Sequence, residues 1–312
     1  MSDFNVAVVI PLFNKAPFIR ATLQSVLAQT LVPTEVLIID DQSTDGSSDA
    51  IADLIGGPVR LIRQANAGPG PARNGGAAEA SAEWIALIDG DDLWGPDHLA
   101  TLAAVASAVP QADVIATDYS EGERAAGPDA LRCAVERPAP RPINFFAESE
   151  GRSRLWTSAT AIRRSVLVSS GGFGAFFPGE DIELWVRLAL DHPIAVTDAR
   201  TAYYVRDTGG LAEQSQDEAG SDIVLGPLFD MLDARICDPL YAASRASLER
   251  FRANYLKSYV RSALYRRNPA MARELVAMSR RHGATGLALL DLLSRLPRRL
   301  LELLFSLRGA MR

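Results

Sequence analysis

Residues 84–92 read Trp84-Ile85-Ala86-Leu87-Ile88-Asp89-Gly90-Asp91-Asp92, a short apolar run that ends in three carboxylates within four positions. Such an apolar run is typical of a strand that a sheet buries on both faces. Like charges at the end of a buried strand repel one another unless a cation neutralises them, and carboxylate oxygens suit Mg²⁺ or Mn²⁺. The alternative is an acidic, solvated turn, since Asp and Gly are common turn residues.

Apolar runs on either side of this segment predict further strands, separated by segments with helical spacing. The expected strands are 6–10, 36–39, 59–62 and 114–117, and the expected helices are about 17–29, 47–55 and 72–81. Strands that alternate with short helices form a mostly parallel sheet covered on both faces. We therefore predict an α/β fold with a Rossmann-like, mostly parallel sheet.

Polar side chains follow the predicted strands where each strand ends, and ligands of such sheets bind beyond the carboxyl ends of the strands. The residues concerned are Asn14, Asp40, Asp41, Asp89, Asp91 and Asp92. Any one of them could be a cap or turn residue, but six are expected to converge on one rim. Arg73 lies at the start of the expected helix 72–81, directly after the Gly- and Pro-rich loop that runs from Asn66 to Pro71. There it either binds a phosphate or carboxylate group or pairs with a strand-end Asp residue.

The length of 312 residues is enough for one large α/β domain, or for one domain with an appendage. Cys133 and Cys237 are far apart and suggest no disulfide framework, which favours a reducing compartment. No basic leader and no run of eighteen uncharged apolar residues occurs, so we expect neither a secretory signal nor a transmembrane helix. Residues 245–312 carry fifteen Arg and Lys against four acidic residues, and such a basic tail favours an anionic partner.

Five motifs, taken in order, resemble those of family 2 glycosyltransferases. They are Val9-Ile10-Pro11-Leu12-Phe13-Asn14-Lys15, Ile38-Ile39-Asp40-Asp41 with the Gln42-to-Ser47 segment, the loop from Asn66 to Gly75, Asp89-Gly90-Asp91-Asp92, and Gly179-Glu180-Asp181. The resemblance covers about residues 4–210. It implies the GT-A fold, a nucleotide-sugar donor, a divalent cation and inversion at the anomeric carbon. We expect a catalytic domain at 1–220 and a helical, basic extension at 221–312.

The resemblance also implies a donor site. Asp41 is its expected base reader, because a carboxylate can accept the N3–H of uracil or thymine, and a UDP-sugar is therefore favoured. For Asp40, the alternative is a turn acceptor for the backbone of Ser43 or Thr44. The full set expected to bind the nucleotide sugar is Pro11, Phe13, Asn14, Asp40, Asp41, Gly68, Arg73, Asp89, Gly90 and Asp91.

Breaking the glycosidic bond builds negative charge on a diphosphate, and a bridging cation stabilises that charge. Asp91 and Asp92 are the predicted ligands of Mn²⁺ or Mg²⁺, with Asp89 nearer the ribose or behind the ligands. Many relatives carry a His near the end of the catalytic domain. Here the segment is Tyr203-Tyr204-Val205-Arg206-Asp207-Thr208, so Arg206 could contact diphosphate or Asp207 could serve as a ligand instead.

Inversion needs a base that takes the proton of the acceptor hydroxyl. Glu180 and Asp181 precede an apolar set at helical spacing, so they lie at a helix N-terminus, which favours ionised carboxylates. Asp181 is the predicted base, and Glu180 orients it or binds the acceptor; the alternative is an ordinary acidic helix start. Trp156 is expected either to stack on an acceptor sugar or to pack in the core.

The last part of the tail, residues 297–308, is apolar on a broad face and flanked by Arg. Such a helix can lie on an anionic membrane surface, or it can pack on the catalytic domain or a second subunit. Nucleic acid is not an expected partner. Because lipid-linked acceptors are common in this family, the resemblance favours a cytoplasmic protein attached to the inner face of the cell membrane.

The predicted function is an inverting glycosyltransferase that moves a sugar to a hydroxyl of a glycan or lipid-linked acceptor in polysaccharide or glycoconjugate assembly. A sugar-nucleotide nucleotidyltransferase is the first alternative. It should carry a Gly-rich, basic loop after the first strand, where this chain has Pro11-Leu12-Phe13-Asn14. The second alternative is a non-catalytic adaptor of the same fold, which would not need Asp91, Asp92 and Asp181.

Overall fold

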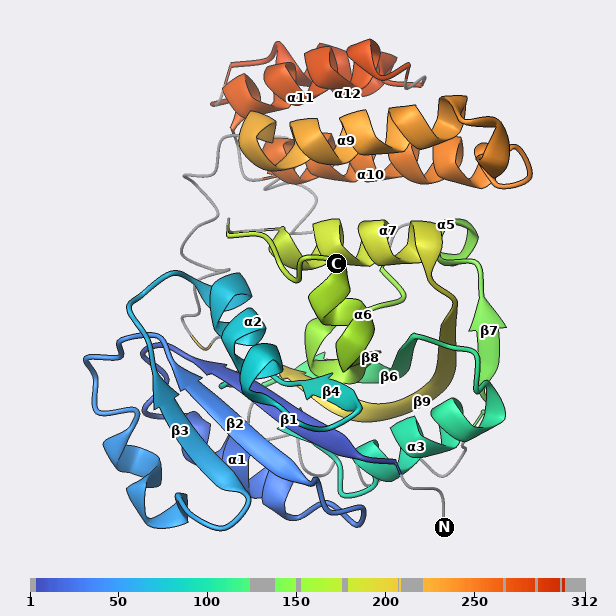
Figure 1. Cartoon of the computed structure of the whole chain (residues 1–312). Helices are drawn as coiled ribbons and strands as arrows, with labels where there is room; N and C mark the ends of the chain where they lie inside the picture. Colours follow the sequence, from blue (N-terminus) through green and yellow to red (C-terminus); the bar gives the residue numbers. More distant parts are fainter. Residues whose placement is uncertain are drawn as a thin grey trace. The chain divides into compact units, whose positions relative to one another are not determined.

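The computed structural model describes residues 4–123, 138–149, 153–175, 179–206, 208, 221–265, 268–283, 286–297 and 299–300 (Figure 1). The chain forms two compact units. The first unit comprises Met1–Asn144 with Arg154–Gln216, and the second comprises Phe145–Ser153 with Asp217–Arg312.

The first unit is built on one sheet, which has nine strands within the described residues. In chain order these are β1 (Val6–Leu12), β2 (Glu35–Asp40), β3 (Val59–Arg63), β4 (Trp84–Leu87), β5 (Leu93–Trp94), β6 (Val114–Gly122), β7 (Arg141–Ile143), β8 (Thr160–Arg163) and β9 (Ile194–Val205). The order across the sheet is β3-β2-β1-β4-β8-β6-β9-β5, and β7 pairs with β9.

The α/β class predicted from the sequence is confirmed, and the sheet is mixed. Strands β3, β2, β1 and β4 are parallel neighbours, as the alternating pattern predicted, and β6 also lies parallel to β9. Strand β8 is antiparallel to both β4 and β6, and β9 is antiparallel to β5 and β7. The parallel half therefore corresponds to the part of the chain in which strands and helices alternate.

Helices of this unit lie on both faces of the sheet. They are α1 (Ile19–Leu27), α2 (Pro69–Glu79), α3 (His98–Ala108), α6 (Arg164–Ser169) and α7 (Glu180–Asp191), with short 3₁₀ turns at Asp49–Leu54 and Thr157–Ala159. Val8 and Ile10 of β1 share a buried apolar cluster with Leu23 of α1. Val9 points to the other face, where a Cβ on Gly76 would lie 2.4 Å from its Cγ1. Gly76 therefore allows α2 to pack closely on β1.

The register of the parallel strands places three carboxyl ends at one edge of the sheet. Leu12, the last residue of β1, pairs with Asp40, the last residue of β2. On the other side of β1, Val9 pairs with Leu87, the last residue of β4. The loops that follow these strands therefore start at the same edge, as the sequence predicted for ligand-binding residues.

The second unit is helical. It contains α5 (Phe145–Glu148), α9 (Ser221–Cys237), a 3₁₀ turn at Pro239–Tyr241, α10 (Arg245–Tyr265), α11 (Pro269–Arg281) and α12 (Ala288–Ser294). Residues 145–153 belong to it because the rings of Phe145 and Phe146 pack on Phe251 of α10, with centroids 5.7 and 5.4 Å away. The domain boundary expected between residues 220 and 221 remains a prediction. That prediction assigned residues 145–153 to the catalytic domain and not to the helical extension.

Within the described residues, none of the helices combines the length and the apolar character needed to cross a bilayer. The helix predicted over residues 297–308 lies almost entirely outside the described residues, as does Asp207.

Candidate active site

A pocket with a volume of about 300 Å³ lies where β1, β2 and β4 end. Most of the residues predicted to bind a nucleotide sugar line it. These are Pro11, Phe13, Asp41, Gly68, Arg73, Asp89, Gly90 and Asp91. The sequence pattern therefore located the rim of the pocket, because parallel strands bring their carboxyl ends together.

Asn14 and Asp40 do not line the pocket and instead fix the loops around it. The Asn14 Oδ1 atom accepts a hydrogen bond from the Thr44 backbone N–H at 2.9 Å, and its backbone has a φ of 51°. The Asp40 Oδ1 atom accepts from the Ser43 N–H at 2.9 Å, and Oδ2 accepts from the Ser48 hydroxyl at 2.7 Å. Asp40 is thus the turn acceptor that the alternative reading described.

Asp41 is buried and holds the Gly-rich loop in place. Its Oδ1 accepts hydrogen bonds from Gln64 Nε2 at 2.8 Å and from the Ala67 N–H at 3.0 Å. Its Oδ2 accepts from the Gly68 N–H at 2.8 Å. Gly68 has a φ of 94°, a conformation that glycine adopts without strain, and α2 begins directly after it. A nucleobase contact of Asp41 remains a prediction.

Arg73 joins the donor-side pocket to the N-terminus of α7. Its side chain is only 5% exposed. Nη2 donates to Asp89 Oδ1 at 2.7 Å, and Nη1 donates to Glu180 Oε1 at 2.8 Å. The guanidinium also lies 5.1 Å from the centre of the Phe173 ring. Of the two roles that the sequence left open for Arg73, the structure shows the pairing with a strand-end carboxylate, while its Nε atom is buried without a partner.

Glu180 and Asp181 form the first turn of α7, as predicted. Gly179 precedes them with a φ of 107°, which explains a glycine at this position. Burial raises the pKa of Glu180 to about 7; the charge of Asp181 adds to this increase and Arg73 opposes it. Burial also raises the pKa of Asp181, and its Oδ1 accepts from the Ile182 N–H at 2.7 Å. Neither side chain lines the pocket described above.

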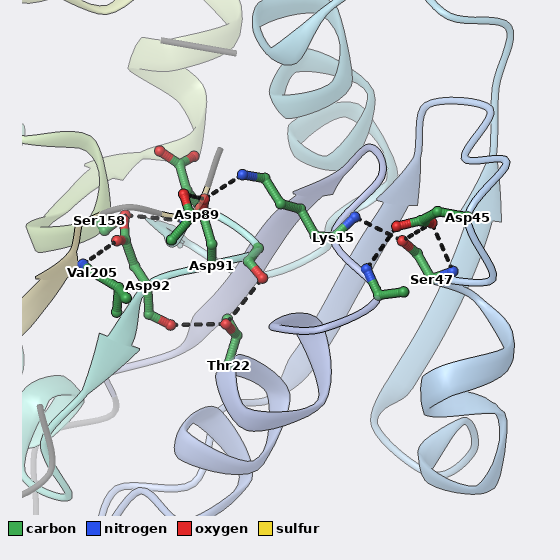
Figure 2. A network of polar contacts seen from close by, with 12 residues as sticks. Lys15, Thr22, Asp45, Ser47, Asp89, Asp91, Asp92, Ser158 and Val205 are labelled. Carbon is green, nitrogen blue, oxygen red and sulfur yellow. Dashed lines mark hydrogen bonds and ion pairs between the residues drawn. The ribbon is translucent and has the colours of Figure 1, made fainter. Parts of the chain in front are cut away.

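The three carboxylates of the acidic turn have different surroundings. Asp92 is buried: its Oδ2 accepts from the Ser158 hydroxyl at 2.6 Å and its Oδ1 from the Val205 N–H at 3.2 Å (Figure 2). Burial, together with the charges of Asp91 and Asp89, raises the pKa of Asp92 well above its usual value. The structure therefore gives Asp92 internal partners at both oxygens, and its assignment as a metal ligand remains a prediction.

The turn itself is fixed to α1. The Thr22 hydroxyl donates to the carbonyl oxygens of Gly90 at 3.1 Å and Asp92 at 2.8 Å (Figure 2). Asp89 and Asp91, in contrast to Asp92, are partly exposed and carry cationic partners, Arg73 and Lys15. Asp92 also lines the pocket but is buried, so Asp89 and Asp91 are the carboxylates of this turn that remain partly exposed there.

Comparison with known proteins identifies the family. The model of glycosyl transferase family 2 matches residues 7–169, more than half of the chain. This chain belongs to glycosyl transferase family 2. Succinoglycan biosynthesis protein ExoW of Rhizobium meliloti (strain 1021) is 45% identical over 98 residues, which are 30% of this chain and 31% of that protein. ExoO of the same organism is 37% identical over 134 residues, covering 39% and 38%. The chain thus matches about a third of the length of these relatives.

Solved structures support the fold of this family 2 member. Staphylococcus aureus TarS 1-349 in complex with UDP-GlcNAc has a TM-score of 0.63 at 17% identity, covering 90% of this chain and 92% of that one. Mannosyltransferase PcManGT from Pyrobaculum calidifontis, in complex with GDP-Man and Mn²⁺, has a TM-score of 0.55 at 21% identity, covering 92% and 78%. At these identities the likeness shows the GT-A type of fold alone.

Sequence reasoning missed the two polar side chains that contact Asp91 at this pocket. Lys15 forms an ion pair with Asp91, and the Thr208 hydroxyl donates to the same Asp91 oxygen at 2.6 Å. Thr208 ends the segment in which a His was expected. Arg206, one of the two replacements considered for that His, pairs instead with Glu121 at 2.6 Å, with both side chains about half exposed. The position of Lys15 directly after a strand-end motif was the available signal.

Carboxylates at the pocket decide whether a divalent cation fits there. Among the described residues, no group of three His, Cys, Asp or Glu side chains is arranged to hold a metal. Mg²⁺ is commonly held by only one or two carboxylates, with substrate phosphates completing its coordination. Asp91 and Asp89 are two carboxylates at the pocket, and they pair with Lys15 and Arg73. They would be the candidates to hold a metal together with a diphosphate.

Trp156 packs against the core and beside the pocket. Its ring centre lies 4.3 Å from that of Tyr119 and 5.6 Å from that of Tyr204. Tyr204 lines the pocket, whereas Trp156 does not. The packing alternative for Trp156 is thus observed, and acceptor stacking remains a prediction.

Proposed function

We propose that this family 2 member transfers a sugar from a UDP-sugar to a hydroxyl of a glycan or lipid-linked acceptor, with inversion at the anomeric carbon. The proposal places the reaction in the assembly of a polysaccharide or glycoconjugate. One observation carries it: Arg73 connects Asp89, at the pocket, to Glu180, at the turn that also carries the base candidate Asp181. A donor site and a proton acceptor are thus linked through one side chain.

Asp41 supports uracil as the base of the donor. A carboxylate has about four lone-pair sites, and the Asp41 carboxylate accepts three hydrogen bonds from the protein. One site remains for the N3–H of uracil, a donor that cytosine lacks. Asp41 lines the pocket together with Pro11 and Phe13, which would enclose the nucleotide.

The diphosphate would lie beside the acidic turn. Asp91, with Asp89 near it, would hold Mn²⁺ or Mg²⁺. That ion would supply positive charge to stabilise the leaving diphosphate. Asp92 would not contact the metal and would instead hold the acidic turn in place through its contacts with Ser158 and Val205. Two accessible carboxylates suffice in this arrangement, since phosphate oxygens provide further ligands.

Asp181 is the proposed base for the acceptor hydroxyl. It lies at the N-terminus of α7, where the helix dipole stabilises a negative charge. Glu180 is fixed by Arg73 and adds to the negative field that receives the proton. Glu180 is a positioning residue in this scheme, because burial limits its own access to an acceptor.

The helical second unit supports a membrane-bound acceptor. Leu289, Leu292 and Leu300 are 66%, 60% and 48% exposed, and Arg295 and Arg299 are exposed among them. Apolar side chains flanked by arginines bind anionic lipid surfaces through burial and charge attraction. The enzyme would therefore work at the inner face of the cell membrane, without entering the bilayer core. Packing on a second protein subunit is the competing explanation of these leucines.

The test is an incubation of the protein with UDP-glucose, UDP-galactose and UDP-GlcNAc, in Mn²⁺ or in EDTA, with an extract of lipid-linked and free glycans. We expect UDP release that depends on the acceptor, and nuclear magnetic resonance should show the β configuration in the product formed from an α-linked donor. Pyrophosphate release from UTP and a sugar phosphate would show a nucleotidyltransferase instead. Absence of both activities, with absence of nucleotide binding, would favour the adaptor.

A further inference from the structure

Lys15 is one of the two cationic side chains that pair with the acidic turn at the pocket, and the other is Arg73. The Lys15 ammonium pairs with Asp91 Oδ2, and the two side chains are only 14% and 15% exposed. The chain has 32 Lys and Arg residues, of which Lys15 and Lys257 are the two lysines. A lysine at this position is therefore unusual for this sequence, which uses arginine almost everywhere else.

The backbone at Lys15 is fixed by hydrogen bonds to Ser47 and Asp45. Its N–H donates to the Ser47 hydroxyl at 2.8 Å, and the next N–H, of Ala16, donates to Asp45 Oδ2 at 2.9 Å. The Asp45 carboxylate also accepts from the Ser47 N–H at 2.9 Å. Burial alone would raise the pKa of Asp45, but a hydrogen bond from the Ser47 hydroxyl, together with those from the backbone N–H groups of Ala16 and Ser47, outweighs burial and lowers the pKa. Figure 2 shows this arrangement, with the Lys15 side chain extending from it toward Asp91.

Lys15 and Arg73 pair with different carboxylates of the acidic turn. Asp89 is neutralised by Arg73, which is also fixed by Glu180, so its guanidinium has little freedom. Asp91 is neutralised by Lys15, whose ammonium ends a flexible four-carbon chain and has no other ion-pair partner within the described residues. Lys15 can therefore exchange partners, whereas Arg73 is held by two carboxylates.

We propose that Lys15 is a diphosphate-binding residue that exchanges between Asp91 and the donor. In the structure its ammonium neutralises Asp91. When a nucleoside diphosphate enters, the ammonium turns to a phosphate oxygen and leaves Asp91 free to hold the divalent cation. This inference rests on the proposed function, because it requires a diphosphate donor in this pocket.

This exchange predicts that Lys15 weakens the binding of a divalent cation alone and strengthens the binding of a diphosphate alone. A cation that binds Asp91 without nucleotide must displace Lys15 and is repelled by its charge, so Lys15 weakens the binding of metal alone. A diphosphate without metal is attracted by the same ammonium, so Lys15 strengthens its binding. A residue that merely stabilised the loop would change both affinities in the same direction.

The experiment is isothermal titration of the full chain with Mn²⁺ alone, and with UDP in EDTA. For Lys15→Met we expect Mn²⁺ to bind more tightly, by about threefold to tenfold, and metal-free UDP to bind about tenfold more weakly. Lys15→Arg keeps the charge and should keep most of the UDP affinity. Lys257→Met removes the other lysine and should change neither affinity.

A second measurement uses the natural chain and does not depend on how the variant folds. An amine-reactive reagent followed by peptide mapping reports on Lys15, with Lys257 as the internal reference. We expect Mn²⁺ alone to increase the labelling of Lys15, because it displaces the ammonium from Asp91. UDP should decrease the labelling, while Lys257 stays unchanged in both cases.

The possible outcomes separate this inference from the proposed function. If the natural chain binds no UDP even with Mn²⁺, the proposed function is overturned. If it binds UDP but Lys15→Met shows both affinities unchanged or both reduced, only the role of Lys15 is overturned. Labelling of Lys15 that does not respond to Mn²⁺ or UDP would likewise contradict the exchange.

Discussion

Arg73 and Glu180 are 107 positions apart in the sequence, yet their side chains form a buried ion pair with Nη1 and Oε1 2.8 Å apart. The pair connects α2, which begins at the donor-side loop, with the first turn of α7. The same guanidinium also binds Asp89, so one side chain contacts both a carboxylate at the pocket and the carboxylate beside the proposed base. This pair is the structural element on which the account depends most.

Replacing Arg73 should destabilise the protein strongly. Arg73→Met leaves the buried carboxyl of Glu180 without its cationic partner, so we expect the free energy of unfolding to fall by about 3–5 kcal/mol. Arg73→Met combined with Glu180→Gln should recover part of this loss, because the stranded charge is then absent. Denaturant unfolding measures both effects.

The matched control is Arg20→Met, which breaks a pair with Asp53 whose side chains are 45% and 62% exposed. Exposed ion pairs contribute little to stability, so the free energy of unfolding should change little. Equal effects of the substitutions at Arg73 and Arg20 would contradict the structural role of the buried pair.

The raised pKa of Glu180 predicts a pH dependence of stability. Burial raises this pKa from 4.5 to about 7, so the folded state binds the proton more tightly than the unfolded chain. The resulting stabilisation is complete below pH 4.5 and is lost as the pH rises through 7. Glu180→Gln cannot ionise, so it should gain about 2–3 kcal/mol relative to the natural chain across this window.

Urea unfolding of both proteins between pH 4 and pH 8 checks this prediction. His98, whose pKa burial lowers to about 3, contributes equally to the two proteins and cancels in the difference. Stability curves that run parallel over the whole range would show that Glu180 does not titrate differently in the folded protein.

Asp91 and Asp92 are adjacent but should respond differently to removal. Asp91→Ala should abolish the increase in UDP affinity that Mn²⁺ causes, because the carboxylate proposed to hold the cation is lost. Asp92→Ala leaves the Ser158 hydroxyl and the Val205 N–H unpaired in a buried site, so it should cost about 2–3 kcal/mol of stability. Titration with UDP and thermal unfolding of both variants separate these effects. The reverse pattern would make Asp92 the metal ligand that the sequence suggested.

The leucines of α12 should determine membrane binding. We expect Leu289→Ser with Leu292→Ser to reduce flotation of the full chain with vesicles that contain phosphatidylglycerol, since the exposed apolar surface is lost. Leu240→Ser is the control, because Leu240 is 88% exposed in the same unit but lies outside α12. Unchanged flotation of the α12 variant would favour packing of these leucines on another protein subunit.

The parallel half of the sheet and the rim of the pocket could be predicted because they follow from local patterns. Apolar runs that end at Ile10, Ile39 and Ile88 indicate buried strands, and parallel strands must share an edge. Strand β9 escaped prediction, since Asp198 and Arg200 face solvent between buried neighbours and interrupt its apolar character. Strand β8 is only four residues long, too short for a clear periodicity.

The contacts within the site depend on distances that no local pattern encodes. Lys15 reaches Asp91 across 76 positions, and Asp92 turns inward to Ser158 across 66. The sequence could therefore propose an acidic turn with a cation, but not which carboxylate is accessible. Likewise, Arg73 near a carboxylate was one of two open alternatives, and only side-chain geometry distinguishes them.

The proposed function requires that the pocket beyond β1, β2 and β4 binds a nucleoside diphosphate together with a divalent cation. Isothermal titration of the full chain with UDP, dTDP and GDP, each with Mn²⁺ and with EDTA, measures this binding. We expect UDP to bind at least about tenfold more tightly with Mn²⁺, dTDP to bind detectably, and GDP to bind more weakly than both. Failure of all three nucleotides to bind in the presence of Mn²⁺ would contradict it.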